Sequence, residues 1–227
     1  MGGVCLVYAD RPGGIRTYAR MLAEGLRAAH PDRPVTALDP RGAVASLWPG
    51  ALLLAAARLV GLAAVGRCEV VHLMVSERSS LVRKGLLAAL SRALGLRVIL
   101  HHHGADFPDL AEGASPPRRR WAALWLRPAH RHLVLGEPWR RALLGLGVPA
   151  ARIEVLPNAL PEGPSAARRR APGPWRLLFL GEISDRKGAL DAVEALGRLA
   201  RRGAAIEACL AGDGPALPAV RRRLAAL

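Results

Sequence analysis

The feature that most constrains the fold is a regular alternation of short apolar runs with longer stretches in which apolar residues recur every three or four positions. The runs are rich in Val, Leu and Ile, as in VVHLMV at residues 70–75, which is typical of strands buried on both faces of a sheet. The longer stretches have the period of amphipathic helices. Strands that alternate with helices in this way predict parallel sheets covered by helices, so the expected fold class is α/β.

The positions of the expected elements follow from these two periods. Residues 51–65 are an apolar stretch that Arg58 interrupts and that is too short to cross a bilayer, so we expect a buried helix there. We expect residues 109–117 to be a loop. Strands are expected at residues 4–9, 35–38, 70–75, 97–101, 132–135, 153–156, 175–180 and 206–210. Helices are expected at residues 15–29, 47–65, 81–94, 118–126, 138–146, 189–202 and 216–226.

The chain is expected to divide at residues 161–174, which carry four prolines and two glycines and are typical of a linker. The part before it, residues 1–162, has the size of one complete doubly wound, Rossmann-like domain. The part after it, residues 175–227, has only two predicted strands and two predicted helices, too few to bury both faces of such a sheet. We therefore expect one complete domain followed by the first part of a second, in a truncated chain.

The net charge of +15 indicates an anionic partner, and the alternatives are a nucleic acid, a sugar nucleotide, a lipid phosphate or a membrane surface. The aromatic fraction of 4% is low for stacking on bases, and 31 of the 33 cationic residues are Arg, which indicates a compositional bias. We therefore expect no nucleic-acid partner. Trp121 and Trp125 follow three arginines at 118–120 and share one helix face, which predicts either contact with an anionic membrane surface or packing into the core.

The three cysteines, Cys5, Cys68 and Cys209, are widely spaced and form neither a metal-ligand pattern nor a disulfide framework. A reducing, cytoplasmic setting fits this spacing. The first apolar run is short and lacks the basic leader of a signal peptide. Residues 101–103 are three consecutive histidines, but successive side chains of a strand point to opposite faces, so we expect no metal there.

Two turns of the first part are candidate ligand sites. Gly13 and Gly14 open a predicted helix, where free backbone N–H groups can bind a phosphate, although a Gly-Gly pair alone is more typical of a plain turn. His103 lies beside Gly104 at the carboxyl end of a predicted strand, the edge at which parallel sheets bind ligands. Its position predicts either contact with a substrate or a hydrogen-bonded histidine at a strand end.

Two turns of the second part are candidates as well. Arg186 and Lys187 lie at a predicted helix start, where acidic side chains are usual, and a bound anion would explain the two cations. Lys84 and Lys187 are the two lysines of the chain, and each stands in an Arg-Lys-Gly triplet. Gly212 and Gly214 form a turn after the last predicted strand, which alone is a common turn.

Six segments, taken in order, resemble the family-4 glycosyltransferases of the GT-B fold, and together they cover nearly the whole chain. The second and third resemble most the enzymes that build bacterial exopolysaccharide or capsule. The resemblance implies two facing Rossmann-like domains, a nucleotide-sugar donor and a saccharide or lipid-linked acceptor. It also implies transfer with retention in polysaccharide biosynthesis, without a metal or another cofactor. The segments are GGIRTYARMLAEGL, VVHLMVSERSSLVRKGLL, VILHHHGADF, RIEVLPNAL, LLFLGEISDRKGALDAVEAL and CLAGDGP.

The resemblance also implies roles for the residues that match the motifs. Lys187 matches the phosphate-binding lysine of the family, and cationic side chains must neutralise a leaving diphosphate in the absence of a metal. Gly13 and Gly14 match the glycine-rich loop near the donor phosphates and the acceptor, and His103 matches the histidine at the reaction centre. The glycines at 212 and 214 match the turn near the nucleotide.

Two departures from the family pattern affect these expectations. Glu182 stands where the family usually has an arginine that contacts the diphosphate, so either Glu182 turns away, Arg186 compensates, or donor binding is weakened. The Glu-x7-Glu motif that grips the ribose and the donor sugar has no counterpart in the chain. The expected protein is cytoplasmic, either free or peripheral at the inner face of the plasma membrane. The alternative is a non-catalytic remnant that binds an acceptor or a membrane.

Overall fold

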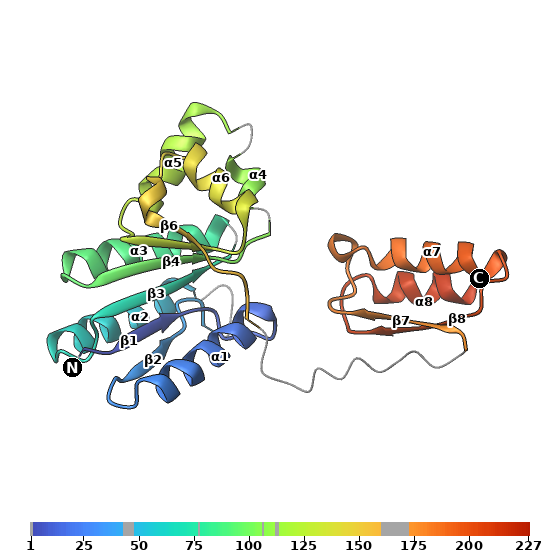
Figure 1. The fold of residues 1–227 in the computed structure, drawn as a ribbon, viewed down its shortest axis with the longest axis horizontal. Coiled ribbons are helices and arrows are strands. Elements are labelled where there is room, and N and C mark those ends of the chain that lie inside the picture. The colour runs from blue at the N-terminus through green and yellow to red at the C-terminus, as the bar shows by residue number, and fades with distance from the viewer. Residues whose placement is uncertain (1, 43–47, 77, 106, 112–113, 160–172) are drawn as a thin grey trace. The chain divides into compact units, whose positions relative to one another are not determined.

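The computed structural model describes residues 2–42, 48–76, 78–105, 107–111, 114–159 and 173–227 (Figure 1). The chain forms two compact units, a first unit of Met1–Glu162 and a second unit of Gly163–Leu227. The predicted linker at 161–174 lies outside the described residues except at positions 173 and 174.

The first unit is built around a six-stranded sheet in the order β2-β1-β3-β4-β5-β6, and all neighbouring strands are parallel. The chain leaves β1 towards β2 on one side and later returns to β3 on the other side, which makes the space beyond the carboxyl ends of β1 and β3 the topological switch point of the sheet. The strands are β1 (Val4–Val7), β2 (Val35–Leu38), β3 (Val70–Val75), β4 (Arg97–His102), β5 (Arg131–Val134) and β6 (Ile153–Val155). The helices are α1 (Gly14–Ala29), α2 (Trp48–Ala64), α3 (Arg78–Ala93), α4 (Phe107–Ala111), α5 (Pro116–Leu126), α6 (Glu137–Gly145) and the 3-10 turn η2 (Ala150–Arg152).

Helices pack on both faces of this sheet. On one face, Leu6 and Met74 pack against Tyr18 and Ala19 of α1. On the other face, the larger core joins residues of β1, β3, β4 and β5 to α2, α3 and α5. The central strands are therefore buried on both faces, which explains why they are continuous apolar runs rather than alternating ones.

Two predictions about this unit are wrong. Residues 109–117 are not a single loop, because α4 extends to residue 111 and α5 begins at Pro116. The ring of Phe107 packs 4.7 Å from that of His102, and Pro116 has the fixed φ that suits a helix start. The helix α2 is not buried either, since Leu53 is 71% and Leu54 is 58% exposed. Only one side of α2 rests on the core.

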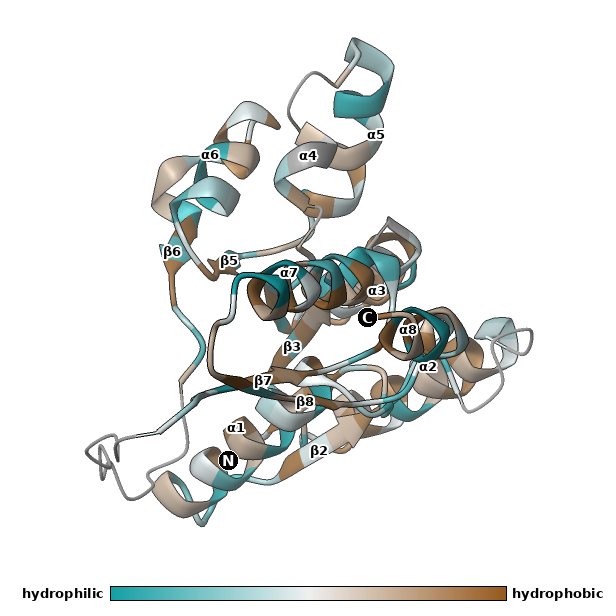
Figure 2. Cartoon of the chain, turned by 90° about the vertical axis from the view of Figure 1, so that its right-hand side faces the viewer, coloured by the Kyte–Doolittle hydropathy of each residue, from teal (hydrophilic) through white to brown (hydrophobic). Residues whose placement is uncertain are grey.

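The second unit has two parallel strands, β7 (Trp175–Leu180) and β8 (Ile206–Ala211). They are joined through the 3-10 turn η3 (Asp185–Lys187) and α7 (Ala189–Arg201), and β8 is followed by α8 (Leu217–Ala225). A small core holds the helices to the turns that follow the strands. The strands themselves remain largely exposed, and Figure 2 shows apolar segments along β7 and β8.

Candidate functional site

The turn between β1 and α1 presents open backbone at the switch point of the first unit. Gly13 is the N-terminal cap of α1 and has φ 143°, a conformation that L side chains rarely adopt. A Cβ atom on Gly13 or Gly14 would meet nothing within 4 Å, so space remains in front of the helix start. The first turn of α1 carries no acidic side chain. The helix start can therefore receive an anion.

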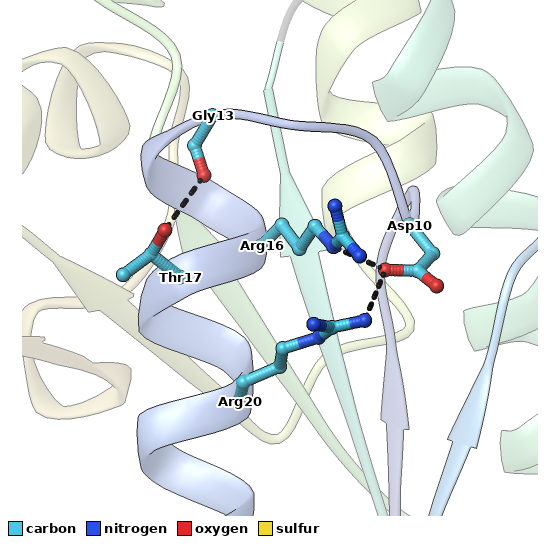
Figure 3. Close-up of polar contacts among 5 residues, drawn as sticks. All are labelled: Asp10, Gly13, Arg16, Thr17 and Arg20. Atoms are coloured by element: carbon cyan, nitrogen blue, oxygen red, sulfur yellow. Dashed lines mark hydrogen bonds and ion pairs between the residues drawn. The ribbon is translucent and has the colours of Figure 1, made fainter.

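On the other side of this turn, Asp10 forms ion pairs with two arginines of α1 (Figure 3). Its Oδ1 atom lies 2.7 Å from Nε of Arg16 and 3.4 Å from Nη2 of Arg20. These ion pairs hold two guanidinium groups of α1 close to the turn. Because Asp10 is already shared by two cations, it leaves a surplus of positive charge at the start of the helix.

A cavity of about 210 Å³ lies against this turn and receives four cationic side chains. They come from places that are far apart in the sequence: the turn after β1, the first turn of α1, the segment after β2, and α3. The sheet order places the ends of β2, β1 and β3 side by side, and this brings the four together. The lining residues are Ala9, Arg11, Pro12, Gly13, Gly14, Ile15, Arg16, Arg41, Ser76 and Lys84.

Lys84 is the buried cation of this cavity, with 4% of its surface exposed. Its Nζ atom donates a hydrogen bond of 2.7 Å to Oγ of Ser80, which also accepts one from the backbone N–H of Ser76. The pKa of Lys84 is lowered to about 7, mainly by burial and to a smaller extent by the nearby Arg83 and Arg41, while Asp39 opposes this shift. Within the described part of the chain, no carboxylate lies within 4.0 Å of Nζ.

His103 lies at the same edge of the sheet, where its backbone N–H donates to the carbonyl of Val75 at 2.7 Å. Its ring lies 4.1 Å from that of His101 and 5.1 Å from that of Tyr18. Burial, with a smaller effect of the charge on Lys84, lowers the pKa of His103 to about 4, so the imidazole is neutral near pH 7. Its Nε2 atom is buried and has no hydrogen-bond partner among the described residues.

The other histidines of the sheet form two buried pairs. The rings of His72 and His101 are joined by a 3.2 Å hydrogen bond, and so are those of His102 and His132. Burial keeps the pKa values of all four imidazoles below their ordinary value, so each pair consists of one neutral donor and one neutral acceptor near pH 7. No group of three or more His, Cys, Asp or Glu side chains in the described residues is arranged to hold a metal ion.

Gly104 shows why a glycine follows the histidine run. A Cβ atom there would lie 2.2 Å from the carbonyl oxygen of Ser76. Nε1 of Trp139 donates a 2.8 Å hydrogen bond to the carbonyl oxygen of Gly104 and anchors α6 to this segment. The close approach of the two backbones sets the position of His103.

The candidates of the second unit gather at the carboxyl edge of its own sheet. Arg186 and Lys187 are exposed on η3, just before α7. A Cβ atom on Gly212 would lie 1.8 Å from the carbonyl oxygen of Gly181, and one on Gly214 would lie 2.4 Å from that of Ile183, so the two turns after β7 and β8 are packed together.

Glu182, the residue that departs from the family pattern, lies in the first of these turns. Its Oε2 atom accepts a 3.1 Å hydrogen bond from the hydroxyl of Ser184. This bond holds the exposed carboxylate beside the hydroxyl of Ser184. Arg186 stays exposed on the following 3-10 turn, where it remains the candidate to compensate for the missing arginine.

The structure thus brings Gly13, Gly14 and His103 to one edge of the first unit and the other four candidates to one edge of the second, while their roles stay predictions. The site residues predicted from the sequence did not include Lys84 or Arg41. The signal for Lys84 was present, since it is one of two lysines in an arginine-rich chain. Arg41 carried no such signal, because its place depends on the order of the strands.

The two tryptophans of α5 have different surroundings. Trp125 packs against the core, where a Cβ atom on Gly85 would lie 2.7 Å from its ring. Trp121 is 38% exposed, and Leu124 on the same helix is 56% exposed. In the described residues, no helix has both the length and the apolar character that spanning a membrane requires.

The family profile of the Glycosyl transferase 4-like domain matches residues 13–159. The chain therefore belongs to this family, and the predicted family resemblance is confirmed. The match covers the glycine turn, the buried lysine and His103. A search of curated protein sequences gave no match.

Solved structures with the same fold are related to the chain at low sequence identity. HepE of Anabaena, in complex with UDP and glucose, has a TM-score of 0.61 and 16% identity, and the match covers 100% of this chain and 66% of HepE. The lipopolysaccharide outer core galactosyltransferase WaaB has a TM-score of 0.59 and 13% identity over 98% of this chain and 64% of WaaB. The UDP-GlcNAc 2-epimerase of Methanocaldococcus jannaschii has a TM-score of 0.53 and 14% identity, over 99% of this chain and 68% of the epimerase.

These matches confirm the predicted α/β, GT-B-like fold class. The chain spans about two thirds of the length of each of these proteins. An epimerase shares the fold with the transferases, so the fold alone does not determine the chemistry.

Proposed function

We propose that the chain belongs to an enzyme that transfers a hexose from a nucleotide-sugar donor to a saccharide acceptor, with retention and without a metal, in polysaccharide biosynthesis. The observation that carries the proposal is the family match over residues 13–159, which includes a neutral, partly buried His103 close enough to Lys84 of the cationic cavity to feel its charge. HepE, which has the same fold, binds UDP and glucose, and this supports a UDP-sugar as donor.

The roles follow from the charge and the position of each group. Arg186, Lys187 and the N-terminus of α7 would neutralise the leaving diphosphate of the donor, with the turn at Gly212 and Gly214 against the nucleotide. Nε2 of His103 has no hydrogen-bond partner among the described residues, so His103 can hydrogen-bond to a sugar hydroxyl at the reaction centre without carrying a charge.

A lipid-linked acceptor at the cytoplasmic face of the membrane is part of the same proposal. The exposed arginines at 118–120, together with Trp121 and Leu124, give α5 a surface suited to anionic lipid headgroups. The enzyme would then meet its acceptor as a peripheral protein.

The test is binding of UDP-glucose to the full chain by titration calorimetry in buffer with EDTA, followed by detection of released UDP and of any sugar product. We expect metal-independent binding that Lys187→Met abolishes. Arg202→Met removes the same charge from an exposed position at the far end of α7 and serves as the control. Equal binding by the two variants would refute the assigned donor site. Donor binding that yields an epimerised nucleotide sugar would refute transfer. An acceptor-binding chain without donor affinity would support the non-catalytic alternative.

A further inference from the structure

The cationic cavity of the first unit is lined by cationic side chains, and no carboxylate of the described residues is part of its lining. Arg41 and Lys84 contribute two of these cations, and Arg16 contributes a third that is paired with Asp10. Asp39 lies close enough to raise the pKa of Lys84 and so balances part of the charge. A negatively charged ligand would fit the charge that remains.

Lys84 indicates more directly that the cavity takes an anion. A lysine with only 4% of its surface exposed is costly to keep unless it has a partner. An ammonium group has three donors, and one hydrogen bond from Nζ is present in the described residues, to Ser80. The cavity is the space into which the remaining donors can point, because Lys84 is part of its lining.

The backbone adds neutral donors to the same space. The helix α1 has 16 residues, and its N-terminal cap has no side-chain hydrogen bond to the first turn. The positive end of its dipole and the free N–H groups after Gly13 therefore lie beside the cationic side chains. The cavity also lies at the topological switch point, where open parallel sheets bind ligands.

We propose that this cavity binds a phosphate group of the acceptor, held by Lys84, Arg41 and the N-terminus of α1. The inference rests on the proposed function and makes it more specific, because it describes the acceptor as a phosphorylated or diphosphate-linked saccharide. The second unit has its own cationic pair at residues 186 and 187 for the donor diphosphate, so the cations of the first unit are available for a different phosphate.

The charge on Lys84 would respond to this ligand. Its pKa is lowered to about 7, mainly by burial, and Arg83 and Arg41 lower it while Asp39 raises it. The charge on Lys84 in turn lowers the pKa of His103. A bound phosphate dianion favours the ammonium form, so binding near pH 7.5 should take up a proton from the buffer.

The test uses the full chain and two probes that separate the sources of phosphate. Farnesyl diphosphate carries a lipid-linked diphosphate without a nucleoside, and UDP carries a nucleoside diphosphate without a lipid. Both are titrated by calorimetry into wild type, Lys84→Met and Lys187→Met. We expect Lys84→Met to weaken the binding of farnesyl diphosphate about tenfold or more, since a hydrogen bond to a charged group is lost. The affinity for UDP should stay unchanged. Lys187→Met should do the reverse.

Two further variants keep the test independent of folding. Arg41→Gln changes a partly exposed side chain of the cavity and should weaken farnesyl diphosphate as well. Arg20→Gln removes a charge of α1 outside the cavity lining and should not. Wild-type affinity for farnesyl diphosphate in Lys84→Met and Arg41→Gln would overturn the proposal. Weaker binding of UDP to these two variants instead would show that the cavity is part of the donor site. Loss of UDP binding in Lys187→Met alone concerns the donor site and tests only the proposed function.

Discussion

Replacing Lys84 with Met should stabilise the protein at neutral pH. The substitution removes the buried ammonium group and keeps an unbranched apolar side chain of similar length. Ser80 retains the backbone N–H of Ser76 as a hydrogen-bond partner. A residue kept for ligand binding at the expense of stability should behave in this way, whereas a structural residue should not.

The size of the effect follows from the pKa of Lys84. Its pKa is lowered from 10.5 to about 7, mainly by burial, and each unit corresponds to about 1.4 kcal/mol. At pH 7 the buried charge therefore lowers the free energy of unfolding by on the order of 4 kcal/mol. Between pH 7 and 10.5 the unfolded chain binds more protons at this position than the folded chain does. The stability of the wild type should therefore rise with pH in that window relative to Lys84→Met, and the difference should approach zero near pH 10.5.

The assay is urea unfolding followed by tryptophan fluorescence at several pH values between 6.5 and 10.5. Of the five tryptophans, Trp175 alone lies in the second unit, so a Trp175→Phe background makes the signal report on the first unit. The difference between Lys84→Met and wild type cancels other groups that titrate in this range. A variant that is less stable than wild type at pH 7, or a difference that does not change with pH, would refute the reasoning.

Three further predictions concern other residues. Gly104→Ala should unfold or strongly destabilise the first unit, because its Cβ would lie 2.2 Å from the carbonyl oxygen of Ser76. Gly14→Ala has open space around its Cβ and should change the free energy of unfolding little. Urea titration measures both. A tolerated Gly104→Ala would contradict the close approach of the backbones. Stability should fall as the pH drops from about 6.5 to about 4, by about 1.4 kcal/mol per pH unit for each buried imidazole, since their folded pKa values lie below 6.5. A flat stability profile there would be inconsistent with neutral, buried histidines. In proton NMR, the imidazole of His103 should remain neutral as the pH falls from about 7.5 to about 5.5, because its pKa is lowered to about 4, and a midpoint near 6.5 would show that it is solvated.

Much of the fold could be predicted because local periodicity encodes it. The strand at residues 70–75 was predicted with the limits that the structure shows, since a run of apolar residues bounded by polar ones has few alternatives in an α/β chain. The five-residue helix α4 could not be predicted, because it is too short for a period and depends on the contact of Phe107 with His102. The exposure of α2 could not be predicted either, because its composition does not tell which side meets the core.

The sequence by itself determined the alternation of strands and helices, the family, and the turns at which ligands of such sheets are expected. These are local properties, set by the residue types within each segment. Only the tertiary structure decided that Arg11, Arg41 and Lys84 share one cavity with the start of α1. The reason is that the strand order β2-β1-β3 places three chain segments side by side, and this order depends on how whole elements pack rather than on any one of them.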